Sequence, residues 1–253
     1  MDIQVIPYIN EACWDDLAHK TVIVIDVLRA TSTIVTALAH GCEAIYPVET
    51  VLEAKQLKQE HPSWLTGGER SCKKIPGFNF GNSPFEYLDD QFAGYPIILT
   101  TTNGTRAIRK AHRACTILIA SLLNGRACAS EAAALNKDIV LLCSGTQDVF
   151  SFEDGICAGQ IIEELYGAVQ GKDVELHIDD FGLSMLYAFR HIQPGMTETL
   201  LHCSNGKRLT KLGFREDVTY CSQMNLIQLV PIVVGDRITA LPVRQSQLAS
   251  QYH

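Results

Sequence analysis

Short apolar runs alternate with helical stretches along this chain, and this alternation limits the folds open to it. Val22–Ile25, Pro96–Thr100 and Ile139–Cys143 are such runs, each followed by a turn rich in Thr, Ser or Gly and then by residues with helical spacing. Such runs are typical of strands covered on both faces of a parallel sheet. The pattern predicts an α/β fold with three layers, α/β/α, a largely parallel sheet and a ligand site at the strand carboxyl ends.

The length of 253 residues and the lack of a clear linker predict one α/β domain over residues 1–253. Residues 171–253 are less regular, and we expect them to complete the sheet or to form a subdomain. Within them, the runs Ile227–Val234 and Arg237–Val243 predict a hairpin around a Gly-Asp turn. We expect this hairpin at the sheet edge, because Pro231 interrupts its first run.

The long irregular stretch Ser71–Asn82 indicates a functional loop, because loops of this length are uncommon unless they serve a site. It ends at Ser83–Glu86, where Ser, Pro and Glu occupy the first positions of a predicted helix. This spacing predicts a capping box, in which Ser83 and Glu86 bond reciprocally to backbone N–H groups.

Composition excludes several classes of partner. The formal net charge is −7 and no basic run is present, so we expect no nucleic acid. No apolar run approaches the roughly 20 residues that span a bilayer, and the first residues lack a secretory signal, so we expect no membrane partner. The nine cysteines are scattered, without a C-x-x-C pair, as is typical of reduced cytoplasmic thiols. We expect a cytoplasmic protein with a small-molecule partner, and formation of a homo-oligomer stays open.

Acidic residues follow three predicted strands. Asp26, Glu69 and Asp154 are expected at one edge of the sheet, because each follows a strand carboxyl end. Their oxygens suit Mg²⁺, which takes one or two carboxylates, keeps several waters and binds substrate phosphate. None of the eight histidines lies in these turns, which disfavours zinc and copper. The structural alternative is that Asp26 caps a helix, Glu69 forms an internal ion pair, and the acids at 153 and 154 only favour a helix start.

Three arginines, Arg29, Arg70 and Arg106, share those turns. A guanidinium fork matches phosphate, carboxylate and sulfonate groups, and Asn103–Thr105 can expose backbone N–H groups to an anion. A phosphate ~4 Å from an unpaired carboxylate is repelled by about 4 kcal/mol at an effective dielectric of roughly 20. Acids and arginines together therefore predict a divalent cation between the protein and an anionic substrate.

Several common motifs are absent from the sequence. The chain has no G-x-x-x-x-G-K-[ST] loop, no G-x-S-x-G elbow and no G-x-G-x-x-G after its first strand. The residue two positions after Asp26 is Leu28, where phosphatases of the haloacid dehalogenase type carry a second aspartate. The site therefore does not match these common templates.

Five motifs occur in order, and together they resemble the 2-phosphosulfolactate phosphatase family. The resemblance covers at least residues 22–159, and it is specific because five motifs keep their order. After Gly171 little resembles the family. The motifs are Val24–Thr33, Gly68–Arg70, Gly81–Pro84, Thr101–Arg106 and Glu153–Asp154.

The resemblance implies a Mg²⁺-dependent hydrolase of a distinct three-layer α/β type. Its reaction would convert 2-phospho-3-sulfolactate to 3-sulfolactate and phosphate, a step in making coenzyme M. As a hypothesis, Asp26, Glu69 and Asp154 are catalytic and hold Mg²⁺ directly or through water, and the nucleophile is either a metal-activated water or Asp26. The predicted substrate-binding residues are Thr102, Asn103, Gly104 and Arg106 for the phosphate, and Arg29 and Arg70 for the carboxylate and sulfonate.

Other functions stay open at this point. The physiological substrate could be another 2-phospho-hydroxy acid, because ester hydrolysis needs few substrate-specific groups. A protein of a different class, a non-catalytic binder of an anionic metabolite, could use the same scaffold. A metal-assisted phosphotransferase would need a nucleotide site, for which the sequence carries no signature.

Overall fold

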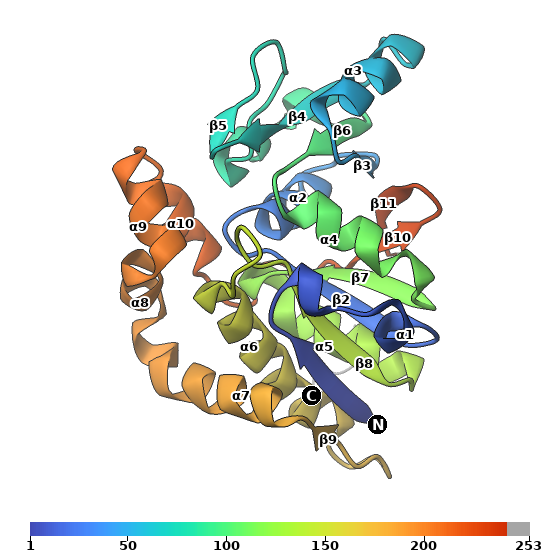
Figure 1. Ribbon diagram of the computed structural model, residues 1–253, viewed down its shortest axis with the longest axis vertical. Coiled ribbons are helices and arrows are strands. Elements are labelled where there is room, and N and C mark those ends of the chain that lie inside the picture. Colours follow the sequence, from blue (N-terminus) through green and yellow to red (C-terminus); the bar gives the residue numbers. More distant parts are fainter. Residues whose placement is uncertain (242–253) are drawn as a thin grey trace, which may run out of the picture.

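The structure is a computed structural model that describes residues 1–241, and one mixed, mostly parallel sheet runs through this part of the chain (Figure 1). In order across the sheet, the strands are β5 (Lys73–Lys74), β4 (Leu65–Arg70), β6 (Ile97–Thr100), β3 (Ile45–Pro47), β11 (Arg237–Ala240), β10 (Pro231–Val234), β7 (Thr116–Ala120), β2 (Thr21–Ile25), β8 (Ile139–Cys143), β1 (Asp2–Ile6) and β9 (His177–Ile178). Strands β7, β2, β8, β1 and β9 form one parallel half, and β4, β6 and β3 form the other.

Helices cover both faces of the sheet, so the predicted three-layer α/β/α fold is confirmed. Among residues 1–241 the helices are α1 (Trp14–Leu17), α2 (Ala30–Ala39), α3 (Val51–Glu60), α4 (Gly104–Lys110), α5 (Gly125–Leu135), α6 (Phe152–Val169), α7 (Asp180–Ile192), α8 (Met196–His202), α9 (Ser204–Lys211) and α10 (Arg215–Cys221). Alternate residues of β2 face opposite layers. Val22 and Val24 pack in the apolar cluster that includes α2 and α4, whereas Ile23 and Ile25 pack in the cluster that includes α5 and α6.

The β10–β11 hairpin joins the two halves of the sheet. Ile232 pairs with β7 and Ile238 pairs with β3, both antiparallel. The predicted hairpin is confirmed, but its predicted place at the sheet edge is wrong. Pro231 is tolerated in the centre because it is the first residue of its strand. The end of the predicted second strand, residues 242–243, lies outside the described residues.

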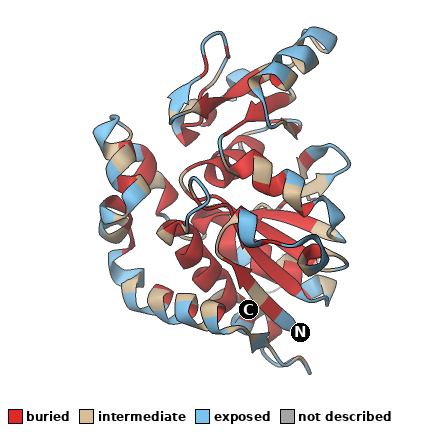
Figure 2. Cartoon of the chain, in the orientation of Figure 1, coloured by how far each residue is buried: buried red, intermediate tan, exposed pale blue. Residues whose placement is uncertain are grey.

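The last third of the described chain contributes three strands to the sheet and the helices α7, α8, α9 and α10. It adds β9, β10 and β11 to the sheet, while α8, α9 and α10 rise along one side of the molecule (Figure 1). Figure 2 shows the strands mostly buried and the outer faces of these helices exposed. None of the described helices is long and apolar enough to cross a lipid bilayer. The assignment of a single domain stays a prediction.

The predicted capping box at Ser83–Glu86 is wrong. Pro84–Tyr87 forms a 3-10 helix, and the Ser83 side chain makes no capping bond. Ser83 Oγ instead donates to Asp217 Oδ1 at 2.8 Å, and Glu86 Oε2 accepts from the N–H of Gly81 at 2.8 Å. Both side chains therefore serve tertiary contacts rather than the helix end.

Candidate active site

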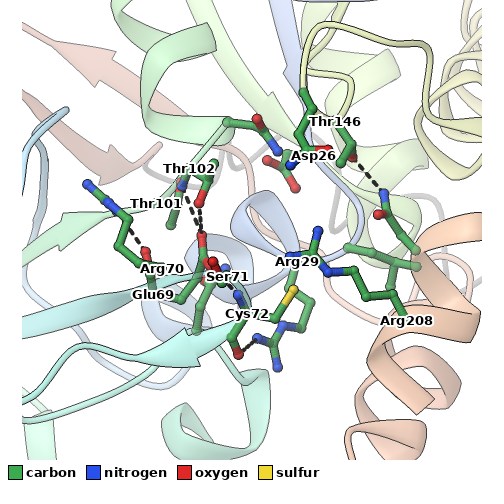
Figure 3. Close-up of a pocket in the computed structure, with 15 residues that line it drawn as sticks. Asp26, Arg29, Glu69, Arg70, Ser71, Cys72, Thr101, Thr102, Thr146 and Arg208 are labelled. Atoms are coloured by element: carbon green, nitrogen blue, oxygen red, sulfur yellow. Dashed lines mark hydrogen bonds between the residues drawn. The ribbon is translucent and has the colours of Figure 1, made fainter. Parts of the chain in front are cut away.

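A pocket opens beside α9, where strands β2, β4 and β6 end (Figure 3). Its wall also includes the loop after β4 and the loop between β8 and α6. The ligand site that the sequence predicts at strand carboxyl ends therefore coincides with a pocket. The predicted site residues that line it are Asp26, Arg29, Glu69, Arg70, Thr102 and Asn103. Those that do not line it are Gly104, Arg106 and Asp154.

Asp26 directly follows β2, and its backbone is held by the first turn of α2. Its N–H donates to Thr31 Oγ1 at 3.0 Å, and Thr31 Oγ1 donates back to the Asp26 carbonyl at 2.8 Å. Asp26 Oδ1 also accepts from the N–H of Ala30, the first residue of α2, at 3.2 Å, so Asp26 supports the start of the helix as well as lining the pocket, while Arg29 occupies the N-cap position. Burial raises the pKa of Asp26 to about 7, and the charges of Glu69 and Glu153 add to this rise.

Gly104 explains how the turn after β6 comes so close to Asp26. A Cβ atom at Gly104 would lie 2.4 Å from the Cβ of Ala30 and 2.9 Å from Asp26 Oδ2. Any larger residue would push α4 away from the carboxylate. Gly104 therefore acts through close packing against Asp26 and Ala30.

Glu69 is the second acid in the pocket, and it lies within β4 rather than in the turn that the sequence predicts. Its Oε1 accepts from the N–H of Thr102 at 2.9 Å and from the Thr102 hydroxyl at 2.8 Å. Its Oε2 accepts from the N–H of Cys72 at 2.6 Å. These bonds fix the carboxylate between two segments of the wall (Figure 3), and they take the place of the internal ion pair considered above.

Asp154 is buried outside the lining of the pocket, and its carboxylate binds backbone N–H groups. Its Oδ1 accepts from the N–H of Val27 at 2.8 Å, and its Oδ2 accepts from the N–H of Gly145 at 3.1 Å. Its neighbour Glu153 accepts from Asn205 Nδ2 at 2.6 Å. Burial, followed by the charges of Glu153 and Asp26, raises the pKa of Asp154 well above its ordinary value. Burial likewise raises the pKa of Glu153, although the Asn205 hydrogen bond opposes the rise.

The guanidinium group of Arg29 is buried and already bound. Its Nη1 donates to Asp217 Oδ2 at 2.5 Å and its Nη2 donates to the carbonyl of Cys72 at 3.0 Å. The ring of Phe214 lies against the guanidinium, 4.4 Å from the carbon to the ring centre. Asp217 is itself buried, so it balances the charge of Arg29 within the protein.

Arg70 and Arg106 point away from the middle of the pocket. Arg70 donates to the carbonyls of Glu69 and Glu49 and to Thr100 Oγ1, at 2.7, 2.8 and 2.9 Å. Figure 3 shows its side chain turned outward. Arg106 is partly exposed on α4, and its Nη1 lies 3.8 Å from Asp148 Oδ1.

The lining also includes residues for which the sequence predicts no role. Asn82 belongs to the Gly81–Pro84 motif, so its position carried a signal. Asn205 and Arg208 come from α9, within a stretch whose polar, mixed composition gave no motif. Thr146 follows β8, and its Oγ1 accepts from Asn205 Nδ2 at 2.7 Å.

The oxygen atoms in the pocket fit a hard cation. Asp26 and Glu69 supply two carboxylates, and the amide oxygen of Asn82 is buried without a hydrogen-bond partner in the described structure. Within residues 1–241, no three Asp, Glu, His or Cys side chains are placed to hold a metal ion by themselves. Mg²⁺ does not need three, because it typically keeps several waters and takes substrate oxygens beside one or two carboxylates.

Similarity to known proteins identifies the family of this chain. Residues 9–236 match the family model described as 2-phosphosulpholactate phosphatase. The chain belongs to the 2-phosphosulfolactate phosphatase family. It is thereby placed among the phosphoric monoester hydrolases.

Curated members of the 2-phosphosulfolactate phosphatase family cover nearly the whole chain. A probable 2-phosphosulfolactate phosphatase of Symbiobacterium thermophilum is 41% identical over 229 residues, which are 90% of this chain and 97% of that protein. Proteins of the same name from Clostridium acetobutylicum and Carboxydothermus hydrogenoformans are 39% and 46% identical, over 91% and 84% of this chain and 97% and 85% of theirs. The family-model match over residues 9–236 includes α9 and α10, so the resemblance extends well beyond Gly171, where the sequence motifs showed little of it.

Proposed function

We propose that this protein is a Mg²⁺-dependent phosphatase that hydrolyses 2-phospho-3-sulfolactate to 3-sulfolactate and phosphate. Family membership supports the reaction. The observation that carries the proposal is that Asp26 and Glu69, which are far apart in sequence, line one pocket together with three arginines. The proposal also places the reaction in coenzyme M biosynthesis, as the family resemblance implies, and in the cytoplasm. The free state of all nine cysteines supports a reducing compartment.

In this proposal Asp26 and Glu69 hold Mg²⁺, and the amide oxygen of Asn82 is a third donor. A bound Mg²⁺ supplies neutralisation of the charge that develops on the phosphoryl oxygens. Thr102 keeps Glu69 in place through two hydrogen bonds. Asp154, the third acid of the sequence hypothesis, receives a supporting role here, because its oxygens accept backbone N–H groups.

Asp26 is the proposed nucleophile. Its carboxylate attacks phosphorus, the bond between phosphorus and the 2-oxygen of sulfolactate breaks, and the leaving oxygen takes a proton from water. A second water then hydrolyses the aspartyl phosphate and regenerates Asp26. The bonds from Thr31 and Ala30 support this role, because they fix the backbone and one oxygen of the carboxylate. The alternative, direct attack by water, leaves no phosphorylated protein.

The phosphoryl group is proposed to lie against the turn after β6. Asn103 lines the pocket there, next to Thr102. Gly104 supports this turn by allowing it to approach Asp26. Arg106 receives no substrate contact in the proposal, because it lies outside the lining and faces Asp148.

Phosphate release tests the proposed function. The purified protein is given 2-phosphosulfolactate or 2-phospholactate, each with Mg²⁺ and with a chelator. Mg²⁺-dependent release that is much faster from 2-phosphosulfolactate is the expected result. Equal or faster release from 2-phospholactate would assign the protein to another 2-phospho-hydroxy acid, and release from neither would favour a non-catalytic binding protein. Rapid quenching with labelled substrate then separates the two nucleophiles, because only attack by Asp26 labels the protein.

A further inference from the structure

The three arginines that line the pocket differ in what holds their guanidinium groups. Arg29 is bound by Asp217 and by the carbonyl of Cys72. Arg70 is bound by two carbonyls and the Thr100 hydroxyl. The guanidinium group of Arg208 makes no hydrogen bond and no ion pair with any residue in the described part of the chain, and its backbone carbonyl is bound by the N–H of Leu212. Its charge is therefore available to a ligand in a way that the other two are not.

Arg208 also points into the pocket. Figure 3 shows its side chain extending from α9 toward the space between Asp26 and Cys72. Its charge lowers the pKa of the Cys72 thiol, against the larger opposite effect of burial. The side chain is half-buried, so its charge is partly removed from water. An unpaired, half-buried cation that faces a pocket favours an anionic ligand there.

The helix that carries Arg208 is fixed to the catalytic side of the pocket. Asn205, three residues earlier on α9, donates to Thr146 Oγ1 at 2.7 Å and to Glu153 Oε1 at 2.6 Å. Gly206 packs so closely on α8 that a Cβ there would lie 1.8 Å from the carbonyl oxygen of Leu200. These contacts set where α9 sits, and they hold Arg208 opposite the turn after β2.

We propose that Arg208 binds the acid group of the substrate that is not the phosphoryl group. This inference rests on the proposed function and deepens it, because the phosphoryl group is assigned to the part of the pocket around Asp26, Glu69 and Asn103. A carboxylate or a sulfonate meets the requirement equally, since each presents two oxygens to a guanidinium fork. Arg208 is thus the residue that separates phosphorylated hydroxy acids from simple phosphate esters.

Binding titrations test the proposal without relying on turnover. Isothermal titration with 3-sulfolactate and with inorganic phosphate, each in the presence of Mg²⁺, is compared for wild type and Arg208→Ala. The matched control is Lys207→Ala, an exposed cation next to Arg208 on the same helix. Loss of a charge-assisted contact predicts affinity for 3-sulfolactate about 10- to 100-fold weaker in Arg208→Ala, with phosphate changed by less than about threefold. Arg208→Lys keeps the charge but lacks the guanidinium fork, so its affinity for 3-sulfolactate should lie between those of wild type and Arg208→Ala.

Steady-state kinetics identify which acid group is bound. Arg208→Ala should raise KM for 2-phosphosulfolactate much more than it lowers kcat. The same rise with 2-phospholactate assigns the carboxylate, whereas a rise only with 2-phosphosulfolactate assigns the sulfonate. The proposal would be overturned if Arg208→Ala lost affinity for 3-sulfolactate and for phosphate equally, or lost affinity for neither. It would also be overturned if the wild-type protein did not bind 3-sulfolactate. If wild type binds 3-sulfolactate as expected but releases no phosphate from any ester, the proposed catalytic function fails while the Arg208 contact stands.

Discussion

The carboxylate of Asp154 accepts a 2.8 Å hydrogen bond from the main-chain N–H of Val27, the residue after Asp26. The same carboxylate accepts from the N–H of Gly145, beyond the end of β8. Asp154 therefore ties together the turns that follow two neighbouring strands. Its place in the site is to hold the segment that carries Asp26.

Substitution of Asp154 tests this supporting role. In Asp154→Asn one acceptor oxygen becomes a donor, so a buried N–H group loses its partner, at a cost of about 1–3 kcal/mol in the free energy of unfolding. Urea unfolding measures this cost, and calorimetry should show Mg²⁺ affinity reduced by less than about tenfold. Unchanged stability with loss of Mg²⁺ binding would instead make Asp154 a metal ligand, as the sequence hypothesis has it.

Gly68 and Gly77 both have positive φ, but only Gly68 has a close neighbour, so substituting them distinguishes the cost of a steric clash from the cost of backbone strain. A Cβ at Gly68, where φ is +141°, would lie 2.0 Å from the carbonyl oxygen of Thr100, whereas a Cβ at Gly77, where φ is +82°, meets nothing within 4 Å. Gly68→Ala should therefore lower the free energy of unfolding by more than about 3 kcal/mol or prevent folding, and Gly77→Ala should lower it by about 1 kcal/mol. Thermal unfolding of both variants checks this. Equal, small losses would mean that β4 does not pack on β6 as closely as described.

The buried pair of Arg29 and Asp217 should be costly to break. Asp217→Asn leaves the Arg29 guanidinium buried beside a neutral partner, and we expect a loss of about 3–5 kcal/mol in the free energy of unfolding. The control is Glu163→Gln, which removes an exposed pair with Arg190 and should cost less than about 1 kcal/mol. Chemical denaturation of the two variants measures both losses. Similar small losses would contradict the burial of the Arg29 charge.

Stability should fall as pH rises in the absence of metal. Burial raises the pKa values of Asp26, Glu153 and Asp154, so between about pH 4 and 7 the folded state binds more protons than the unfolded state. The contribution of these three groups to the free energy of unfolding is fully present below their pKa values in the unfolded state. It is lost as pH rises through their pKa values in the folded state, which for Asp26 is about 7. Urea unfolding with a chelator should give lower stability at about pH 8 than at about pH 5.5.

A variant identifies the source of this pH dependence. Glu153→Gln removes one of the buried charges and should lessen the loss of stability toward high pH. Wild-type stability that rises between the two pH values would contradict the raised pKa values.

Local sequence signals predicted the first half of the site. Asp26 could be placed because it ends an apolar, β-branched run, and strand ends of an α/β sheet collect ligands. Glu69 could be assigned to the same site, although its place inside β4 was missed because Gly67 and Gly68 read as a turn. Gly in a strand often marks a close approach of backbones, and at Gly68 the neighbour is Thr100.

Long-range contacts account for what the sequence could not predict. Arg208 and Asn205 lie on a short polar helix with no motif, and only the packing of α9 brings them to the pocket. The role of Ser83 was misassigned because its partner, Asp217, lies 134 positions away. The hairpin was placed at the edge because a Pro rule that holds for strand interiors was applied to a strand's first residue.

Turnover by Asp26→Asn at saturating Mg²⁺ tests whether Asp26 carries the chemistry. Phosphate release from 2-phosphosulfolactate is measured for this variant and for wild type, with circular dichroism to confirm that both are folded. We predict that the variant is slower by several orders of magnitude, because it loses both the attacking carboxylate and a metal ligand. Near-normal turnover by a folded Asp26→Asn protein would mean that Asp26 is neither the nucleophile nor a required metal ligand.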